Sequence, residues 1–284
     1  MSIQAGALHI VATPIGNLDD LGPRAQAVLA GVDVIAAEDT RHTGALLGHL
    51  GIRAEQTSLH EHNEAERIPH LVARLVAGAT VALVSDAGTP VLSDPGFRLV
   101  VAAHEAGIRV VPVPGPSAIT AALSAAGQPT DRFLFAGFPP AKSRARRNWL
   151  QDLADQPATL VLFESCHRLA RTLADLAAIF GTERPATLCR ELTKRYETVH
   201  RATLGALVEF VASDPDQRRG EVVLVVAGGT PQSQRSADLA TVLDALLPEL
   251  PPARAAAVAA RLTGQPRKVA YRAALEQGES HKPD

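Results

Sequence analysis

Short runs of apolar residues alternate with longer segments of helical periodicity along the first half of the chain. The runs contain few polar positions, which is typical of strands that are covered on both faces. The predicted strands span residues 8–12, 32–36, 81–84 and 109–113. The predicted helices between them span residues 23–30, 64–77 and 96–106. This alternation predicts a mostly parallel sheet with helices on both faces.

A second series of strands begins near Asp131 and has shorter connections. The predicted strands span residues 132–137, 158–163, 186–192 and 221–227. Another strand-like segment, 196–202, follows so closely that the second sheet is expected to be mixed, with antiparallel pairs. Gly, Pro and Asp interrupt the pattern at 127–132. We therefore expect a first α/β domain over 1–127 and a second over 128–231.

The last part of the chain, 232–284, is expected to be a small helical module. Residues 228–236 are rich in Gly, Ser, Gln and Pro and predict a linker. Prolines and a Gly-Gln-Pro sequence divide the Ala-rich remainder into three predicted helices. These helices carry the basic residues Arg254, Arg261, Arg267, Lys268 and Arg272. Two interpretations are open: a solvated helical cap, or a helix-turn-helix-like module that contacts RNA.

The composition narrows the class of protein. The 284 residues include 28 Lys and Arg and 30 Asp and Glu, for a formal net charge of −2, which excludes a globally basic nucleic-acid coat but not a local patch. Two cysteines without a CxxC pair argue against a zinc ribbon or disulfide scaffold. Prolines break the longest uncharged stretch, 110–130, so no membrane segment is expected there. Residues 1–17 lack the Lys and Arg of a signal peptide, so we expect a cytoplasmic protein.

Common nucleotide and hydrolase motifs are absent from the sequence. There is no GxGxxG after the first strand, and no GxxxxGK[ST], GxSxG or HExxH motif. Instead, turns rich in Gly and Pro follow three predicted strands, at 13–17, 85–96 and 114–118. A single turn of this kind is most simply a tight strand-to-helix connection. Three turns at one edge of a parallel sheet, with Asp86 and Asp94 among them, favour a ligand cleft.

The run VSDAGTPVLSDPG at 84–96 resembles the signature of the 16S rRNA ribose methyltransferases of the tetrapyrrole-methylase superfamily. The resemblance covers nearly the whole chain. Its further motifs are HIVATPIGNLDDL (9–21), AAEDTRHT (36–43), LHEHNE (59–64), PVPGPSA (112–118), GFPP (137–140), FESCHR (163–168), RELTKRYE (190–197) and GEVVLVVAG (220–228).

This resemblance implies a two-domain α/β methyltransferase of tetrapyrrole-methylase-like fold that binds S-adenosylmethionine between its domains. It also implies a homodimer that methylates the ribose 2′-oxygen of a cytidine in the decoding region of 16S rRNA, as free rRNA or in the small ribosomal subunit. Two alternatives stay open: a methylase of a small tetrapyrrole or a protein side chain, and a non-catalytic RNA-binding assembly factor. An aromatic content of 4% argues against a porphyrinoid pocket.

The resemblance also implies the cofactor-binding residues. Asp86 is expected to face the ammonium or sulfonium group, Phe163 and Glu164 to close over the cofactor, and Leu192 and Ala227 to lie near the adenine. The full set is Pro14, Ser85, Asp86, Ala87, Gly88, Asp94, Ser117, Ala118, Phe163, Glu164, Leu192 and Ala227.

Polar residues after the second strand are candidates for catalysis or RNA contact. The candidate catalytic residues are Asp39, Arg41 and Glu164. Glu38 and Asp39 have an alternative role as N-caps of the next helix. The spacing of His60 and His62 gives only a weak metal signal, since no third ligand is evident, and we expect no metal. For Cys166, a structural role is favoured over that of a nucleophile.

A basic cluster at 142–147 is the main candidate for RNA contact. The structural alternative is a solvated helix face, but a cluster this dense in a chain of net charge −2 favours phosphate binding. The predicted RNA-binding residues are Lys142, Arg144, Arg146, Arg147, Arg168 and Lys194.

Overall fold

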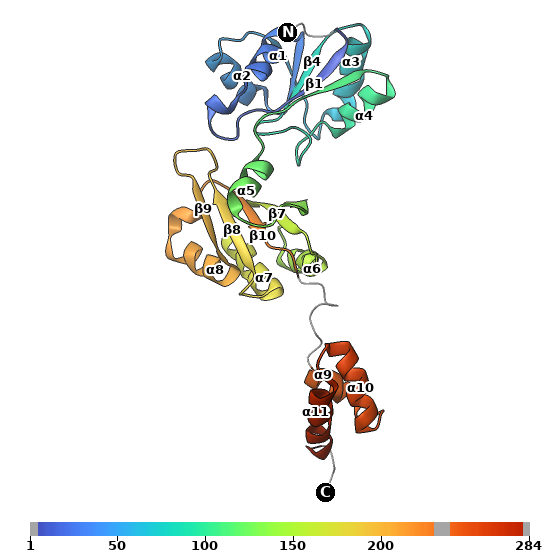
Figure 1. Ribbon diagram of the computed structural model, residues 1–284. Helices are drawn as coiled ribbons and strands as arrows, with labels where there is room; N and C mark the ends of the chain where they lie inside the picture. The colour runs from blue at the N-terminus through green and yellow to red at the C-terminus, as the bar shows by residue number, and fades with distance from the viewer. Residues whose placement is uncertain (1–4, 230–238, 281–284) are drawn as a thin grey trace. The chain divides into compact units, whose positions relative to one another are not determined.

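The computed structural model describes residues 5–229 and 239–280 (Figure 1). The chain forms two compact units. One comprises residues 1–150 and 159–227 and contains both sheets. The other comprises residues 151–158 and 228–284 and contains the C-terminal helices.

The first sheet has the strand order β3-β2-β4-β1-β5, and all its pairings are parallel, as predicted. The strands β4 (Val81–Val84) and β5 (Arg109–Val113) have the predicted bounds. The bounds of the other strands are β1 (Ala7–Val11), β2 (Val34–Ala37) and β3 (Glu55–Ser58). Because β2 and β4 are buried at every position, both of their faces are covered.

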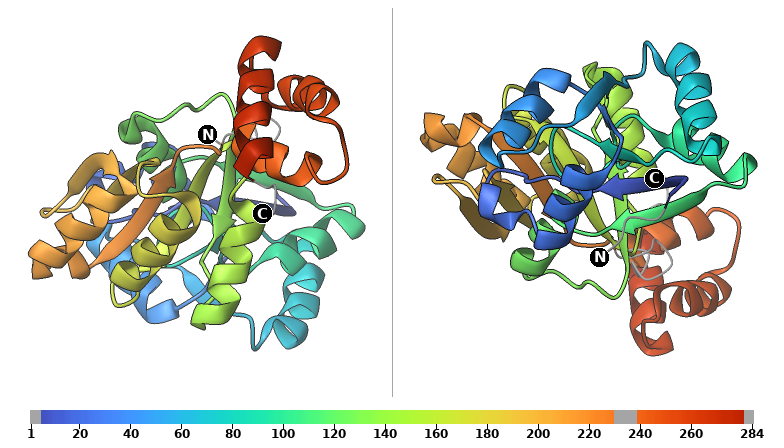
Figure 2. Two further views of the ribbon diagram at one scale, coloured as in Figure 1. Left: turned by 90° about the horizontal axis from the view of Figure 1, so that it is seen from below. Right: turned by 90° about the horizontal axis from the view of Figure 1, so that it is seen from above.

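Helices cover this sheet on both faces, as Figure 2 shows. Their bounds are α1 (Pro23–Gly31), α2 (Thr40–His49), α3 (Glu64–Val76) and α4 (Phe97–Glu105). Successive side chains of a strand point to opposite faces. Accordingly, Ile35 packs with α1 and α2, whereas Val34 packs with α3 and α4.

The second sheet is mixed, as predicted. Its order is β6-β7-β10-β8-β9; β6 and β7 are parallel, and the other pairs are antiparallel. The strands are β6 (Phe133–Gly137), β7 (Thr159–Ser165), β8 (Pro185–Arg190), β9 (Thr198–Thr203) and β10 (Glu221–Val226). The helices that follow these strands are α6 (Ser143–Leu153), α7 (Leu169–Phe180) and α8 (Leu204–Ser213).

Helix α5 (Ala118–Ala126) belongs to the second sheet by its packing. Ile119 and Leu123 pack in one core cluster with Val161 and Val223 of that sheet. The chain therefore passes to the second sheet before α5, and not at 127–132 as the sequence suggested. The physical reason is that α5 carries no charged side chain and can be covered by a sheet, whereas the breakers after it only end the helix.

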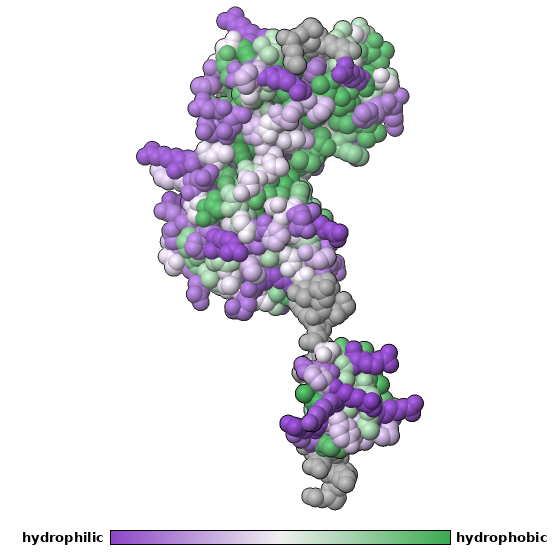
Figure 3. Space-filling model, viewed as in Figure 1, coloured by the Kyte–Doolittle hydropathy of each residue, from purple (hydrophilic) through white to green (hydrophobic). Residues whose placement is uncertain are grey.

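The described C-terminal residues form the three predicted helices, α9 (Leu239–Leu246), α10 (Pro252–Thr263) and α11 (Arg267–Ser280). Their core contains one leucine and several alanines, which allow the helices to approach closely. The module's basic side chains are exposed, and Figure 3 shows hydrophilic residues on its surface. Most of the predicted linker, 228–236, lies outside the described residues.

Candidate active site

A cavity of about 280 Å³ lies at the carboxyl ends of the first sheet's strands. The loop after β4 contributes Asp86, Gly88 and Asp94, and the start of α5 contributes Ser117 and Ala118. Residues of the second sheet and its loops complete the wall, among them Phe163, Leu192 and Val223. The cavity is therefore built from both sheets of one compact unit.

The three Gly/Pro-rich turns converge at this cavity, as predicted. Thr13 and Gly88 exchange backbone hydrogen bonds of 2.9 and 3.0 Å, which pair the first turn with the second. The hydroxyl of Thr89 donates to the carbonyl of Pro116 at 3.1 Å, which joins the second turn to the third. Gly88 has a φ of +84°, and a Cβ there would lie 3.3 Å from Ile15 Cγ2. Both the backbone conformation and the space at this position thus favour glycine.

Five carboxylates line the cavity, and two of them, Glu164 and Glu221, are paired with Arg168 and Lys194. The other three are those of Glu38, Asp86 and Asp94. Burial raises the pKa of Glu38, and the neighbouring carboxylates, Asp94 foremost among them, raise it further. Burial likewise raises the pKa of Asp94, with a smaller contribution from Asp86. In the part of the chain that the structure describes, none of the three forms an ion pair. The cavity therefore favours a cationic ligand.

Aromatic and aliphatic side chains form another part of the cavity wall. The ring of Phe163 packs edge-on against Phe135 at 4.8 Å and Phe138 at 5.5 Å between centroids. Phe138 is 53% exposed and, with Leu92, lies at the rim of the cavity. A cavity that combines apolar side chains with unpaired carboxylates fits a ligand that has both an aromatic ring and a positive charge.

Two cavity-lining leucines sit in strained loops. Leu92 lies between Val91 and Ser93, whose φ angles are +77° and +69°. Leu192 lies between Glu191 and Thr193, with φ angles of +52° and +67°. These four are the positive-φ non-glycine residues of the described chain. Strained backbone of this kind concentrates at functional sites, and both pairs flank a side chain that contacts the cavity.

Most of the predicted cofactor residues line the cavity. These are Asp86, Ala87, Gly88, Asp94, Ser117, Ala118, Phe163, Glu164 and Leu192. Ser85 is buried, and its hydroxyl donates a hydrogen bond to the Asp94 carboxylate. Pro14 lines an adjacent cavity.

Ala227 is not brought to the cavity. It follows the last residue of β10 and donates its N–H to the carbonyl of Pro185 at 2.9 Å. The cavity is lined instead by Glu221, Val222 and Val223 at the other end of the same strand. Ala227 therefore lies at the end of β10 that does not line the cavity.

Glu164 and Arg168 neutralise each other. Arg168 Nη2 lies 2.6 Å from Glu164 Oε1, and the carboxylate also accepts from the Ser165 N–H at 2.7 Å and from the Thr172 hydroxyl. The Glu164 side chain is fully buried. These contacts argue against a catalytic proton acceptor at Glu164 and an RNA contact at Arg168.

Asp39 and Arg41 form a local pair outside the cavity. Asp39 is the N-cap of α2, and its carboxylate binds the side chain of Arg41 at 2.6 Å and accepts the Arg41 N–H at 2.8 Å. These contacts hold the pKa of Asp39 far below its usual range, and the hydrogen bond from the Arg41 guanidinium has the largest effect. Asp39 is therefore a poor proton acceptor, and the capping alternative is confirmed for it. Glu38, which is not a cap, lines the cavity instead.

The basic cluster divides into exposed and buried members. Lys142, Arg144 and Arg147 are exposed. Arg146 is buried, and its guanidinium binds Asp175 at 2.7 and 2.8 Å. Arg146 lies one helical turn before the buried Leu150, so it shares the inner face of α6, and the prediction of RNA contact for it is wrong.

Lys194 also forms ion pairs within the protein. Its ammonium lies 2.9 Å from both Glu191 Oε1 and Glu221 Oε2. Its stem lies where a side chain at Gly16 would be. Lys194 therefore joins the first turn to the second sheet and does not present a free charge to RNA.

Two further observations concern the described residues. The described part of the chain contains no cluster of His, Cys, Asp and Glu suited to a metal ion. Within 5–229 and 239–280, no helix has both the length and the apolar character needed to cross a bilayer.

The fold and the site define a class of protein. Residues 7–208 match the family described as Tetrapyrrole (Corrin/Porphyrin) Methylases, and residues 233–278 match the RsmI C-terminal HTH domain. Among solved structures, uroporphyrin-III-C-methyltransferase from Thermus thermophilus has a TM-score of 0.56 and 24% identity, covering 79% of this chain and 96% of that one. The methyltransferase CobJ has a TM-score of 0.59 and 19% identity, covering 78% and 94%. The chain is thus a methyltransferase of tetrapyrrole-methylase fold.

Full-length relatives narrow the class further. Ribosomal RNA small subunit methyltransferase I of Xylella fastidiosa (strain Temecula1) is 55% identical, covering 94% of this chain and 98% of the relative. The protein of the same name from Pseudomonas aeruginosa is 52% identical, covering 98% and 100%. That from Escherichia coli O157:H7 is 51% identical and covers 96% of each. The chain belongs to the ribosomal RNA small subunit methyltransferase I family.

Proposed function

We propose that this protein transfers a methyl group from S-adenosylmethionine to the ribose 2′-oxygen of a cytidine in the decoding region of 16S rRNA. One observation carries the proposal. A cavity with three unpaired carboxylates and an aromatic wall stands at the strand ends of a chain whose full-length relatives are named for rRNA methylation. Since its substrate would be the small ribosomal subunit or its rRNA, we place the enzyme in the cytoplasm.

The cavity suits this cofactor chemically. S-adenosylmethionine has a sulfonium and an ammonium group, and when bound it supplies an activated methyl group. Glu38, Asp86 and Asp94 would favour these cations, and Phe163 and Leu192 would contact the adenine. Gly88 lines the cavity without a side chain, so its main chain can approach a ligand. A Cβ at Gly115 would lie 3.1 Å from Ala12 Cβ, so glycine there allows the third turn to pack closely against the end of the first strand.

Transfer to a ribose oxygen breaks the bond between sulfur and methyl, whose electron pair stays on sulfur, while the new oxygen–methyl bond forms. The hydroxyl proton must also leave. We assign its acceptance to Glu38, which lines the cavity, has no cationic partner among the described residues and has a raised pKa. Orientation of the two reactants can contribute roughly 7–11 kcal/mol. A general base adds about 10² to 10⁴-fold, so the cavity's shape matters more than the base.

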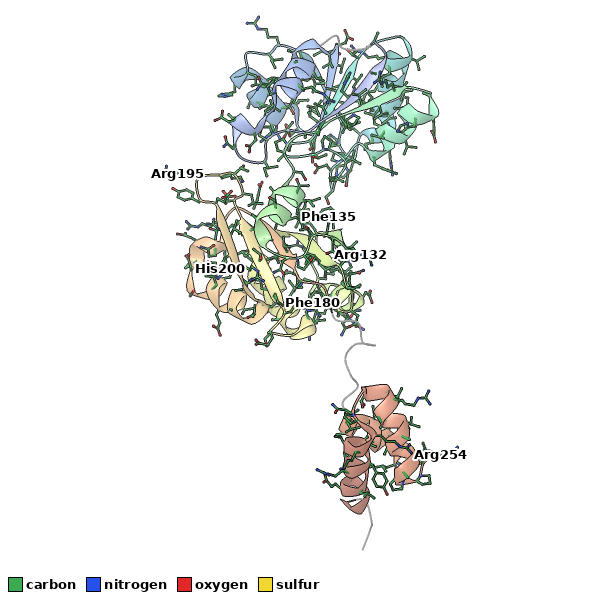
Figure 4. All side chains as sticks on the ribbon, viewed as in Figure 1. Arg132, Phe135, Phe180, Arg195, His200 and Arg254 are labelled. Carbon is green, nitrogen blue, oxygen red and sulfur yellow. The ribbon has the colours of Figure 1, made fainter. Side chains whose placement is uncertain are left out.

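The RNA partner is supported by exposed basic residues on two parts of the chain. Lys142, Arg144 and Arg147 surround the start of α6. The C-terminal module, which matches an HTH domain, exposes further Arg and Lys residues, among them Arg254, labelled in Figure 4. Phosphate groups would bind such side chains.

A homodimer is proposed on the basis of an exposed apolar strip. Phe97 and Val101, one turn apart on α4, are 66% and 37% exposed, and Leu92 in the preceding loop is 44% exposed. A second copy of the chain would cover these side chains. Sedimentation of the wild type should give a dimer, and F97E should shift it to the monomer. A monomeric wild type would contradict this part of the proposal.

The central experiment uses small ribosomal subunits from a strain that lacks this enzyme. The purified protein is incubated with them and with methyl-labelled S-adenosylmethionine, and the rRNA is digested and analysed by mass spectrometry. We expect one 2′-O-methylcytidine in the decoding region. Label on the base, on protein or on a tetrapyrrole would contradict the proposal.

A further inference from the structure

A second cavity, of about 350 Å³, lies directly beside the first. The two cavities share the lining residues Ile15, Asp86, Ala87 and Glu221. Glu38 lies at this junction, because its Oε2 accepts the N–H of Asp86 at 3.3 Å. A donor in the first cavity and an acceptor in the second would therefore be neighbours. Group transfer requires the donor and the acceptor to lie side by side.

Helix α2 forms one wall of the second cavity. His42, Ala45, Leu46 and His49 line it, and their spacings of three and four residues place them on one helix face. Leu46 is half-buried, whereas the other three are exposed. Neither imidazole has a hydrogen-bond or ion-pair partner among the described residues. This wall thus has the apolar side chain of Leu46 at its centre, between the imidazoles of His42 and His49, which form no hydrogen bond or ion pair with the described residues.

Apolar side chains line another part of the cavity. They are Pro14, from the first turn, and Leu18, just after it, which is 43% exposed. Lys194 also lines the cavity, but its ammonium is already paired with Glu191 and Glu221. An anionic group in this cavity would therefore be held by His42 and His49 and not by Lys194.

We infer that the second cavity binds the acceptor nucleotide of a single-stranded RNA segment. This inference rests on the proposed function and names the place of its substrate. The base and ribose contact Pro14, Leu18 and Leu46, and a backbone phosphate contacts His42 and His49. Proteins read RNA at unstacked nucleotides that turn out into such pockets. A volume of about 350 Å³ is within the range of small-ligand sites, roughly 300–1,000 Å³.

The loop between β8 and β9 supplies a stacking surface next to this cavity. Arg195 and Tyr196 follow Lys194 directly, and both are exposed, Tyr196 by 65%. The Arg195 guanidinium carbon lies 5.5 Å from the centroid of the Tyr196 ring. Figure 4 shows Arg195 projecting from the loop. An exposed aromatic ring beside a cation is a surface on which a neighbouring base of the RNA strand can stack.

The first test removes both imidazoles. The double variant His42→Ala/His49→Ala is compared with His70→Ala/His104→Ala, which removes two exposed histidines from α3 and α4. We expect the apparent KM for small ribosomal subunits to rise about tenfold in the first variant only, which corresponds to 1.4 kcal/mol. Subunit binding measured without donor should weaken by the same factor, while calorimetry should show unchanged affinity for S-adenosylmethionine. The variant His42→Lys/His49→Lys should recover most of the binding, because lysine ammonium groups can bind the same phosphate.

The second test fills the cavity. Ala45 lines the second cavity and not the first, so Ala45→Phe should abolish methylation while leaving cofactor affinity unchanged. Ala65→Phe, at an exposed position of α3, is the matched control. An active Ala45→Phe enzyme, a histidine variant that behaves like its control, or a failed rescue by lysine would overturn the acceptor site. If the wild type also methylates no rRNA, the proposed function is contradicted as well. If the wild type methylates rRNA and only the variants give these results, the proposed function stands and the acceptor site alone is contradicted.

Discussion

The backbone N–H of Asp39 donates a hydrogen bond to Oδ1 of Asp86 at 3.1 Å and so joins the turn after β2 to the turn after β4. In return, the N–H of Asp86 donates to Glu38 in the first of these turns. The pair of contacts orients the Asp86 carboxylate at the junction of the two cavities. The charge of Asp86 and its hydrogen bond can be removed separately.

Asp86→Asn keeps an oxygen for the Asp39 N–H but removes the charge. We expect its affinity for S-adenosylmethionine to fall about tenfold, a change of 1.4 kcal/mol, with an unchanged melting temperature. Asp86→Ala removes the hydrogen bond as well and should also melt earlier, since the partly buried N–H of Asp39 loses its acceptor, at a cost of about 0.5–1.5 kcal/mol. Calorimetry and thermal melting measure the two effects. Wild-type affinity in both variants would place the cofactor elsewhere.

Gly88→Val should abolish cofactor binding. Gly88 has a φ of +84°, and a side chain there would press on Ile15, which lines the cavity. Gly51→Val is the control, because Gly51 has a φ of +67° but has nothing within 4 Å of an added Cβ. We expect both variants to lose stability and only the first to lose binding in calorimetry. Equal binding in the two variants would contradict a ligand beside this turn.

Glu38→Gln should lower kcat about 10² to 10⁴-fold if Glu38 accepts the proton. Because it also removes one of the three unpaired charges of the cavity, it should weaken the binding of S-adenosylmethionine. In the wild type, kcat should fall as the pH drops through the raised pKa of Glu38, because a protonated carboxyl accepts nothing. That acid limb should be absent from the variant. Glu66→Gln, at an exposed position on α3, should keep both rate and profile.

Glu38→Gln should also stabilise the fold at neutral pH. Because the folded-state pKa of Glu38 is raised, folding favours its protonated form, and the stability from this group is lost as the pH rises through that pKa. A neutral glutamine avoids this loss. Urea unfolding at about pH 7.5 should therefore give a larger free energy of unfolding for the variant. A lower value would mean that the Glu38 carboxylate is needed for structure.

Replacing Lys142, Arg144 and Arg147 together by Ala should weaken subunit binding and leave cofactor affinity intact. Each lost phosphate contact should reduce the salt slope of binding by about 0.7. Arg146→Ala should act differently: it removes the buried partner of Asp175, which keeps only a longer contact of 3.9 Å to Arg147, and should destabilise the fold by about 3 kcal/mol. Filter binding at several salt concentrations, with urea unfolding, separates the two effects. An unchanged salt slope in the triple variant would exclude the exposed cluster from the RNA contact.

His9 should make the fold sensitive to acid. Burial, followed by the charges of Arg24 and Arg109, lowers the pKa of this imidazole, and neither ring nitrogen has a hydrogen-bond partner. The folded state therefore favours neutral His9, and stability is lost as the pH falls below about 6.5 toward the lowered pKa. His9→Leu should lose less stability between about pH 7.5 and about pH 5.5 in urea unfolding. An equal loss in both proteins would assign the acid sensitivity to other groups.

Much of the fold follows from local patterns. The bounds of β4 match its apolar run because a strand buried on both faces needs continuous apolar sequence. The bounds of β5 also match, although this edge strand is only partly buried. The placement of α5 was not predictable in this way. Its apolar sequence fits either sheet, and only the packing against Val161 and Val223 assigns it to the second.

The site was predictable where backbone chemistry defines it and less so where side-chain partners do. Glycine and proline turns after parallel strands pointed to the cavity around Gly88. The left-handed residues around Leu92 and Leu192 had no sequence signal, since valine, serine, glutamate and threonine rarely adopt that conformation. One sequence signal could have distinguished the role of Glu38 from that of Asp39. Asp39 directly precedes helix α2 and caps it, whereas the side chain of Glu38, one residue earlier, is free to point elsewhere.

The sequence by itself determined the alternation of strands and helices, the parallel sheet that this alternation predicts, and the Gly and Pro residues of each turn. These depend on interactions between near neighbours in the chain. The tertiary structure alone decided which charges are neutralised. Arg146 meets Asp175 and Lys194 meets Glu221 across 29 and 27 residues of sequence, whereas Glu38 and Asp86 meet no cation in the described chain. Electrostatic energy depends on distance in space and on burial, and both arise only when distant segments pack together.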